Sequence, residues 1–147
     1  VPARFIVNVG GFRETYGAVP DNVYLDAWFP QPSVVAQCDL FIHHGGNNSF
    51  CEALYFGVPS LIMPYCWDGH DNAARAAETA VGRRFDRYDW SDAELAAAIE
   101  GLLGDKTMHA RLKANAAKMH RAAGATRAAE EIVRVATGAV GAARASV

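Results

Sequence analysis

Short apolar runs alternate with segments of helical periodicity along this chain, and the alternation limits the folds that it can adopt. Runs that contain β-branched and aromatic residues lie at 4–9, 22–28, 39–43 and 60–63, and a weaker one lies at 83–85. Such short runs, bounded by glycine or proline, are typical of strands. Strands that alternate with helices predict βαβ units, and therefore an α/β fold with a parallel sheet flanked by helices.

The second half of the chain carries mainly helix signals. Ser91 and Glu94 form an S-x-x-E capping box that predicts the start of one helix, and Gly104 predicts its end. We expect the apolar residues of the last two helices to pack against the sheet. These residues are Met108, Leu112, Met119, Ile132 and Val133. The other helices are predicted at 33–38, 48–56, 71–80, 105–123 and 126–136, and a loop is predicted at 12–20.

The size and composition of the chain exclude several classes of protein. Its 147 residues suit one domain, which we place at 1–137 and follow with a flexible tail at 138–147. A net charge of -2 argues against binding to a nucleic-acid backbone, and no apolar run approaches the roughly 20 residues that span a bilayer. Three cysteines without a CxxC spacing favour a reducing cytoplasm over a disulfide framework.

The turn between the strand at 39–43 and the helix at 48–56 is the strongest candidate for a ligand site. Ligands of open α/β sheets bind beyond the carboxyl ends of the strands. Gly45 and Gly46 let the backbone approach a ligand closely, and the helix start offers free N–H groups and a partial positive charge. Together these features predict a phosphate site. The alternative is that Ser49 and Glu52 form an ordinary capping box, which needs no ligand.

Four ordered sequence blocks extend this prediction. They are W-F-P-Q at 28–31, H-G-G-N-N-S-x-x-E-A-L at 44–54, G-V-P at 57–59 and P-x-x-x-D-x-x-x-N-A at 64–73. Their order and separation resemble the donor-binding signature of the family 1 glycosyltransferases that use UDP-sugars and have the GT-B fold. The resemblance implies the C-terminal, Rossmann-like half of such an enzyme. Because the chain starts at Val1 and reaches a strand at once, we expect a fragment that lacks the first strand of that half.

The resemblance also implies a role for individual residues. The indole of Trp28 would stack on the nucleotide base, and Glu52 would accept hydrogen bonds from ribose hydroxyls, which favours UDP over dTDP. His44 would contact the diphosphate, and Asp68 would hold hydroxyls of the transferred sugar. The full set of donor-binding residues that the resemblance implies is Trp28, Phe29, Gln31, His44, Gly46, Asn48, Ser49, Glu52, Asp68 and Gly69.

The sequence departs from the family pattern at two of these blocks. Gly69 stands directly after Asp68, where the family usually has Gln, so one sugar contact is lost and the donor sugar stays open. His70 or Asp71 are candidates to replace that contact. Asn47 stands where plant members carry Trp, but the backbone N–H is the group usually needed there.

The activity that the resemblance implies is transfer of a sugar from a nucleotide sugar to a small-molecule acceptor, with inversion and without a metal or cofactor. The general base and most of the acceptor pocket would lie in an N-terminal domain outside this chain, so we expect it to bind the donor with little activity. The His, Cys and Asp residues match no standard zinc spacing. The alternatives are a UDP-sugar epimerase on the same fold and the donor-binding subunit of a split glycosyltransferase. A dimer formed through the surface of the last helices is a further hypothesis.

Overall fold

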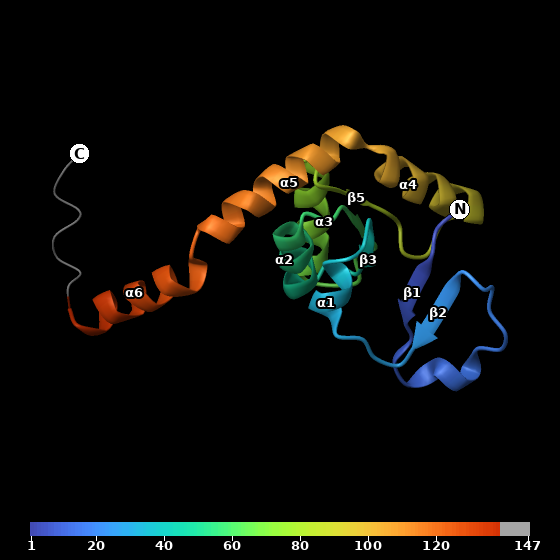
Figure 1. Cartoon of the computed structure of the whole chain (residues 1–147), viewed down its shortest axis with the longest axis horizontal. Coiled ribbons are helices and arrows are strands. Elements are labelled where there is room, and N and C mark those ends of the chain that lie inside the picture. Colours follow the sequence, from blue (N-terminus) through green and yellow to red (C-terminus); the bar gives the residue numbers. More distant parts are fainter. Residues whose placement is uncertain (139–147) are drawn as a thin grey trace.

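The strands of the computed structural model, which describes residues 1–138, are all parallel, as predicted. They are β1 (Phe5–Asn8), β2 (Val23–Asp26), β3 (Phe41–His43), β4 (Ser60–Ile62) and β5 (Gly82–Arg84). They divide into two sheets, one with the order β1-β2 and one with the order β3-β4-β5. In Figure 1 the blue pair β1 and β2 lies apart from the other three strands. The predicted tail lies, from residue 139 on, outside the described residues.

The helices confirm the α/β order, with shifts at their ends. They are η1 (Gly10–Thr15), α1 (Gln31–Val35), α2 (Asn47–Phe56), α3 (Asp68–Glu78), α4 (Asp92–Gly104), α5 (Lys106–Arg121) and α6 (Gly124–Ala136). The predicted loop at 12–20 was partly wrong, because its first residues belong to the 3-10 helix η1. Helix α3 begins three positions before the predicted start at 71, so Asp68 is its first residue. The capping box of α4 is present, with Ser91 and Glu94 bonded reciprocally.

The core lies around β4, whose three residues are all buried. Leu61 and Ile62 of this strand contact side chains of the helices, and Met108 and Leu112 bring α5 into the same cluster. The prediction that these two residues pack against the sheet is therefore confirmed. Because β4 is the central strand of its sheet, the core fixes the carboxyl end of β3 beside it, where the predicted turn begins.

Strands β1 and β3 each have a neighbour on one side only. Among residues 1–138 no further strand pairs with the other side of β1 or β3. The expected lack of a first strand stays a prediction. The side chains of β1 are consequently poorly covered, and Ile6 is 53% exposed. Phe5 alone of this strand packs against the main core.

Helix α6 stands away from the rest of the structure (Figure 1). None of its residues is buried, and Ile132 and Val133 are 69% and 59% exposed. The expectation that these two residues pack against the sheet was wrong, because α6 follows a left-handed turn at Ala123 and leaves the surface of the domain. Among residues 1–138, none of the helices has the length and hydropathy of a membrane-spanning segment.

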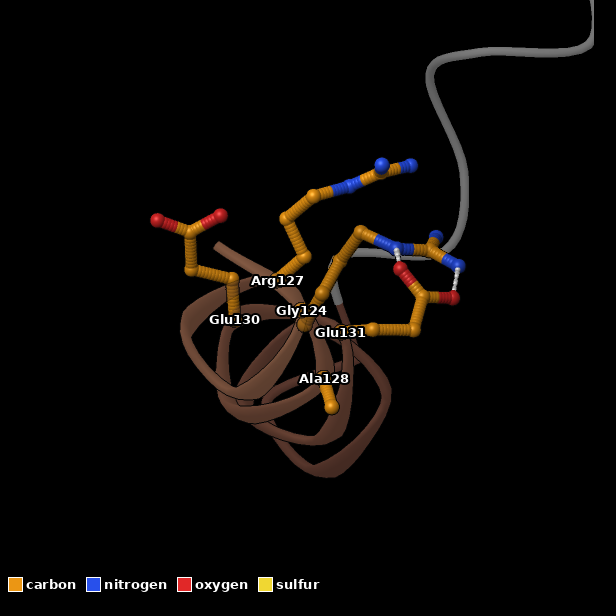
Figure 2. A pocket seen from close by; sticks show the side chains of 6 residues that line it. Gly124, Arg127, Ala128, Glu130 and Glu131 are labelled. Atoms are coloured by element: carbon orange, nitrogen blue, oxygen red, sulfur yellow. Dashed lines mark hydrogen bonds and ion pairs between the residues drawn. The ribbon is translucent and has the colours of Figure 1, made fainter. Parts of the chain in front are cut away.

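A shallow hollow beside α6 is formed, among the described residues, by residues of that helix. Figure 2 shows Arg127 and Glu130 pointing outward, while Glu131 is joined to Arg134 by an ion pair. The Nε group of Arg134 donates a hydrogen bond to Oε2 of Glu131 at 2.8 Å. Within residues 1–138 no second element contributes to its lining, so these residues do not bring together the converging groups that characterise a binding site.

Candidate functional site

An open hollow of about 590 Å³ lies at the amino end of α2, which is where the sequence predicts a ligand site. Its volume is within the usual range for small-molecule sites. It is lined by residues of α1, of the turn before α2, of α2 itself and of the start of α3. These residues are Gln31, His44, Gly46, Asn47, Asn48, Ser49, Glu52 and Asp68. The hollow thus brings together most of the predicted donor-binding residues, whereas Trp28, Phe29 and Gly69 are not part of its lining.

The turn from β3 into α2 depends on Gly45, which is buried and has a φ of 89°. A Cβ atom at this position would lie 2.7 Å from the carbonyl oxygen of Gly69 and 2.8 Å from Cγ2 of Ile62. Both distances are too short for real atoms, and the positive φ disfavours any residue with a side chain. The glycine therefore lets the turn lie directly against the start of α3.

The side chain of His43, at the end of β3, supports the turn through hydrogen bonds. The N–H of Gly45 donates to its Nδ1 at 3.1 Å, so Nε2 carries the ring proton and donates to Oγ of Ser60 at 3.1 Å. Burial, and to a lesser extent the neighbouring His44, together lower the pKa of His43 to about 4. Because the ring is neutral, its Nδ1 atom can accept the hydrogen bond that holds the backbone of Gly45.

The start of α2 offers backbone donors to the hollow. Gly46 is the N-cap of α2, and as a glycine it has no side chain that could cap the helix. The Gly46 N–H donates to Nδ1 of His44 at 3.2 Å, and the Asn47 N–H donates to Oδ2 of Asp68 at 2.9 Å. Within residues 1–138 the next two amides, those of Asn48 and Ser49, have no acceptor. Free amides at a helix start are suited to an anionic group.

Gln31, Ser49 and Glu52 form one hydrogen-bonded cluster in the lining of the hollow. Nε2 of Gln31 donates to Oε2 of Glu52 at 2.7 Å and to Oγ of Ser49 at 3.2 Å. The alternative that Ser49 and Glu52 form a capping box was wrong, because α2 begins at Asn47 and both residues lie inside the helix. The cluster leaves Oε1 of Glu52 and the hydroxyl proton of Ser49 available to a ligand.

The start of α3 is fastened to the turn through Asn72 and Gly69. Nδ2 of Asn72 donates to the carbonyl oxygen of Gly45 at 2.8 Å and to Oδ1 of Asn47 at 3.3 Å. A Cβ atom at Gly69 would lie 2.6 Å from the carbonyl oxygen of His44. This close approach gives a physical reason for glycine at 69, where the sequence departs from the family pattern.

The comparisons with known proteins decide the family of the chain. A family model described as "Erythromycin biosynthesis protein CIII-like, C-terminal domain" matches residues 3–137. The chain belongs to this CIII-like family. The resemblance to the C-terminal domain of family 1 glycosyltransferases is thereby confirmed.

Curated relatives of this CIII-like chain are named glycosyltransferases. NDP-glycosyltransferase YjiC of Bacillus subtilis (strain 168) is 32% identical over 119 residues, which are 81% of this chain and 30% of the relative. Zeaxanthin glucosyltransferase of Pseudescherichia vulneris is 38% identical over 108 residues, which are 74% of this chain and 26% of the relative. The alternative of a UDP-sugar epimerase receives no support from these relatives.

Solved structures confirm the Rossmann-like half of a GT-B fold for this CIII-like chain. The glycosyltransferase of kitacinnamycin matches with a TM-score of 0.82 and 30% identity, over 89% of this chain and 34% of its own. Glycosyltransferase VinC, solved in complex with dTDP, matches with a TM-score of 0.84 and 25% identity, over 93% of this chain and 35% of its own. The chain therefore spans about a third of the length of these proteins.

Two predicted aromatic residues of this CIII-like chain lie outside the hollow. Trp28 follows β2 and is 70% exposed, and the ring of Phe29 lies edge-on to Tyr24 with the centroids 6.0 Å apart. The contact assigns Phe29 a packing role at the end of β2. The role of Trp28 in stacking on a base stays a prediction.

Sequence reasoning missed two residues that shape the site. His43 and Asn72 both bond to Gly45, but neither was among the predicted donor-binding residues. A signal existed for each, since His43 ends a predicted strand and Asn72 lies in the fourth matched block. In the part of the chain that the structure describes, no three His, Cys, Asp or Glu side chains gather as a metal site. The prediction that no metal is needed has not been tested by this arrangement.

Proposed function

We propose that this chain is the donor-binding part of a glycosyltransferase that moves a sugar from a nucleotide sugar to a small-molecule acceptor. One observation carries the proposal. Asn48 and Ser49, whose amides have no acceptor within 1–138, line the same hollow as His44 and Glu52. Donors for a diphosphate and an acceptor for the ribose hydroxyls of the nucleotide therefore line the same hollow.

The proposed chemistry uses the amino end of α2. Glycosyl transfer expels a nucleoside diphosphate, and negative charge grows on that leaving group in the transition state. Amides of Asn48 and Ser49, together with the side chain of His44, would stabilise this charge because they are fixed in place before the reaction. In this proposal the helix start and His44 do the work that a divalent metal does in other transferases, and no cofactor takes part.

The nucleoside would lie on the side of the hollow that Gln31 and Glu52 form. Within residues 1–138 one carboxylate oxygen of Glu52 has no donor, and that oxygen would accept from ribose hydroxyls. The bond from Gln31 holds this carboxylate in place. Since two ribose hydroxyls favour UDP over dTDP, we propose a UDP-sugar as the donor. The exposed indole of Trp28 is available for stacking on the base.

The catalytic base and the acceptor pocket are assigned to an N-terminal domain that this chain does not contain. The chain alone would then bind the donor and transfer little, and the inverting outcome would be set by that other domain. The exposed apolar residues Ile132 and Val133 of α6 supply a surface for a second copy of the chain. A cytoplasmic location, predicted from the unpaired cysteines, completes the proposal.

Calorimetry with UDP tests the proposal. Wild-type protein should bind UDP, and the His44→Ala variant should bind it about tenfold more weakly, because a charge-assisted contact is lost. His120→Ala is the matched control, since His120 lies on α5 and bonds to the carbonyl oxygen of Tyr55. Equal affinities of wild type and His44→Ala would remove His44 from the site. No binding of UDP by the wild type would overturn the proposed function.

A further inference from the structure

Asp68 occupies part of the position that an anionic ligand would take. It is the first residue of α3, yet its Oδ2 atom accepts a hydrogen bond from the N–H of Asn47 at 2.9 Å. Asn47 is the first residue of α2, so the carboxylate of Asp68 lies at the positive end of that helix. A side chain of the protein thus supplies negative charge at a helix start that also lines the candidate site.

The neighbouring backbone is held by two close contacts, whereas the Asp68 side chain is exposed. The close contact of Gly69 with the carbonyl group of His44, and the bond from Asn72 to Gly45, set the distance between the starts of α2 and α3. Asp68 itself is exposed, and its hydrogen bond to Asn47 is the one that the structure assigns to its carboxylate within 1–138. Rotation of this side chain can therefore break the contact without moving either helix.

The charge on this carboxylate distinguishes between two kinds of ligand. A nucleoside diphosphate brings several negative charges to the start of α2 and lacks the hydroxyl groups of the transferred sugar that could donate to Asp68, so the two repel each other. A nucleotide sugar brings the same charges together with hydroxyl groups, which can donate to Asp68 and draw it away from Asn47. We propose that Asp68 is a specificity-determining residue that makes the site prefer the nucleotide sugar over the free nucleoside diphosphate.

This inference rests on the proposed function and adds the direction in which UDP affinity changes when Asp68 is replaced. A residue that only binds sugar leaves UDP affinity unchanged when it is replaced. In our proposal replacement of Asp68 strengthens the binding of UDP, because a like charge leaves the start of α2. The same preference assists turnover, since the loss of the sugar lets Asp68 return to Asn47 and weakens the hold on the diphosphate product.

The test measures UDP and UDP-glucose binding by calorimetry for wild type, Asp68→Asn and Asp68→Ala. Asp68→Asn keeps an oxygen that can accept from Asn47 and removes the charge, while Asp68→Ala removes both. We expect UDP to bind about three- to tenfold more tightly to both variants, and the preference for UDP-glucose over UDP to fall by at least the same factor. Asp92→Asn is the matched control, because Asp92 is an exposed aspartate in the first turn of another helix, α4, and does not line the hollow.

Several outcomes separate this inference from the proposed function. UDP binding that is unchanged or weaker in Asp68→Asn would overturn the inference and leave the proposed function standing. An unchanged ratio of UDP-glucose to UDP affinity in Asp68→Ala would overturn it as well. Equal tightening by Asp92→Asn would show a general charge effect and would also overturn it. Circular dichroism and thermal unfolding of each variant establish that the fold is intact.

Discussion

The buried imidazole of His43 predicts a specific loss of stability in mild acid. Its pKa in the folded chain is about 4, while an unfolded chain has the ordinary value of 6.5. The neutral ring is therefore favoured by the fold, and the unfolded state takes up a proton first as the pH falls. The stabilising contribution is complete above pH 6.5 and is lost progressively between pH 6.5 and about 4.

The size of this effect follows from the two pKa values. A difference of one pKa unit corresponds to about 1.4 kcal/mol, so the difference between 6.5 and about 4 gives about 3 kcal/mol in total. Between pH 7.5 and pH 5 the linkage relation gives a loss of about 2 kcal/mol. Asp86 and Glu94 also have lowered pKa values, but carboxyl groups of this kind act below pH 5. The interval from pH 7.5 to pH 5 therefore separates the effect of His43 from that of these carboxyl groups.

Urea unfolding at a series of pH values measures the effect. The free energy of unfolding of the wild type should fall by about 2 kcal/mol over this interval, and that of His43→Gln should stay nearly constant. His120→Gln is the control, since His120 is exposed, and it should follow the wild type. A slope in His43→Gln equal to that of the wild type would refute the assignment of the pH dependence to this ring.

Three other predictions concern separate parts of the structure. Gly45→Ala should lower the free energy of unfolding by at least about 2 kcal/mol and weaken UDP binding, whereas Gly101→Ala, in open space on α4, should raise the free energy of unfolding by about 0.5 kcal/mol. Thermal unfolding distinguishes the two variants, and equal effects would contradict the steric argument. Ser91→Ala should cost about 1 kcal/mol, as measured by urea unfolding, because the capping box is lost; an unchanged midpoint would mean that the cap does not stabilise α4. Glu52→Gln should weaken binding of UDP more than binding of dTDP in calorimetry, since dTDP offers one ribose hydroxyl fewer; equal losses would remove the ribose contact.

The sequence predicted the parts of the fold that depend on local patterns. The order of strands and helices, the capping box of α4 and the turn before α2 were all readable, because periodicity, caps and glycines act over a few residues. The division of the strands into two sheets and the position of α6 away from the domain could not be predicted. Both depend on which surfaces meet in space, and an apolar stripe such as that of α6 looks the same whether or not something covers it.

The candidate site shows the same difference between local and distant relations. Matched blocks identified most of the residues that line the hollow, including Gln31 and Glu52, but not the hydrogen bond that joins them across 21 positions. The contact of Asp68 with Asn47 was likewise unpredicted, because it follows from the close approach of two backbones at Gly45 and Gly69. Spacing in a sequence indicates which groups are present, and packing decides which of them already have partners.

The incomplete pairing of β1 has a consequence for handling the purified chain. Within residues 1–138, β1 pairs with β2 on one side, and its Ile6 and Val7 are more than a third exposed. A strand edge of this kind is a template on which another chain can pair. Segments of this kind, apolar and β-branched, promote aggregation as protein concentration rises. Ile6→Lys should therefore raise the protein concentration at which aggregation begins, without changing the hollow beside the other sheet.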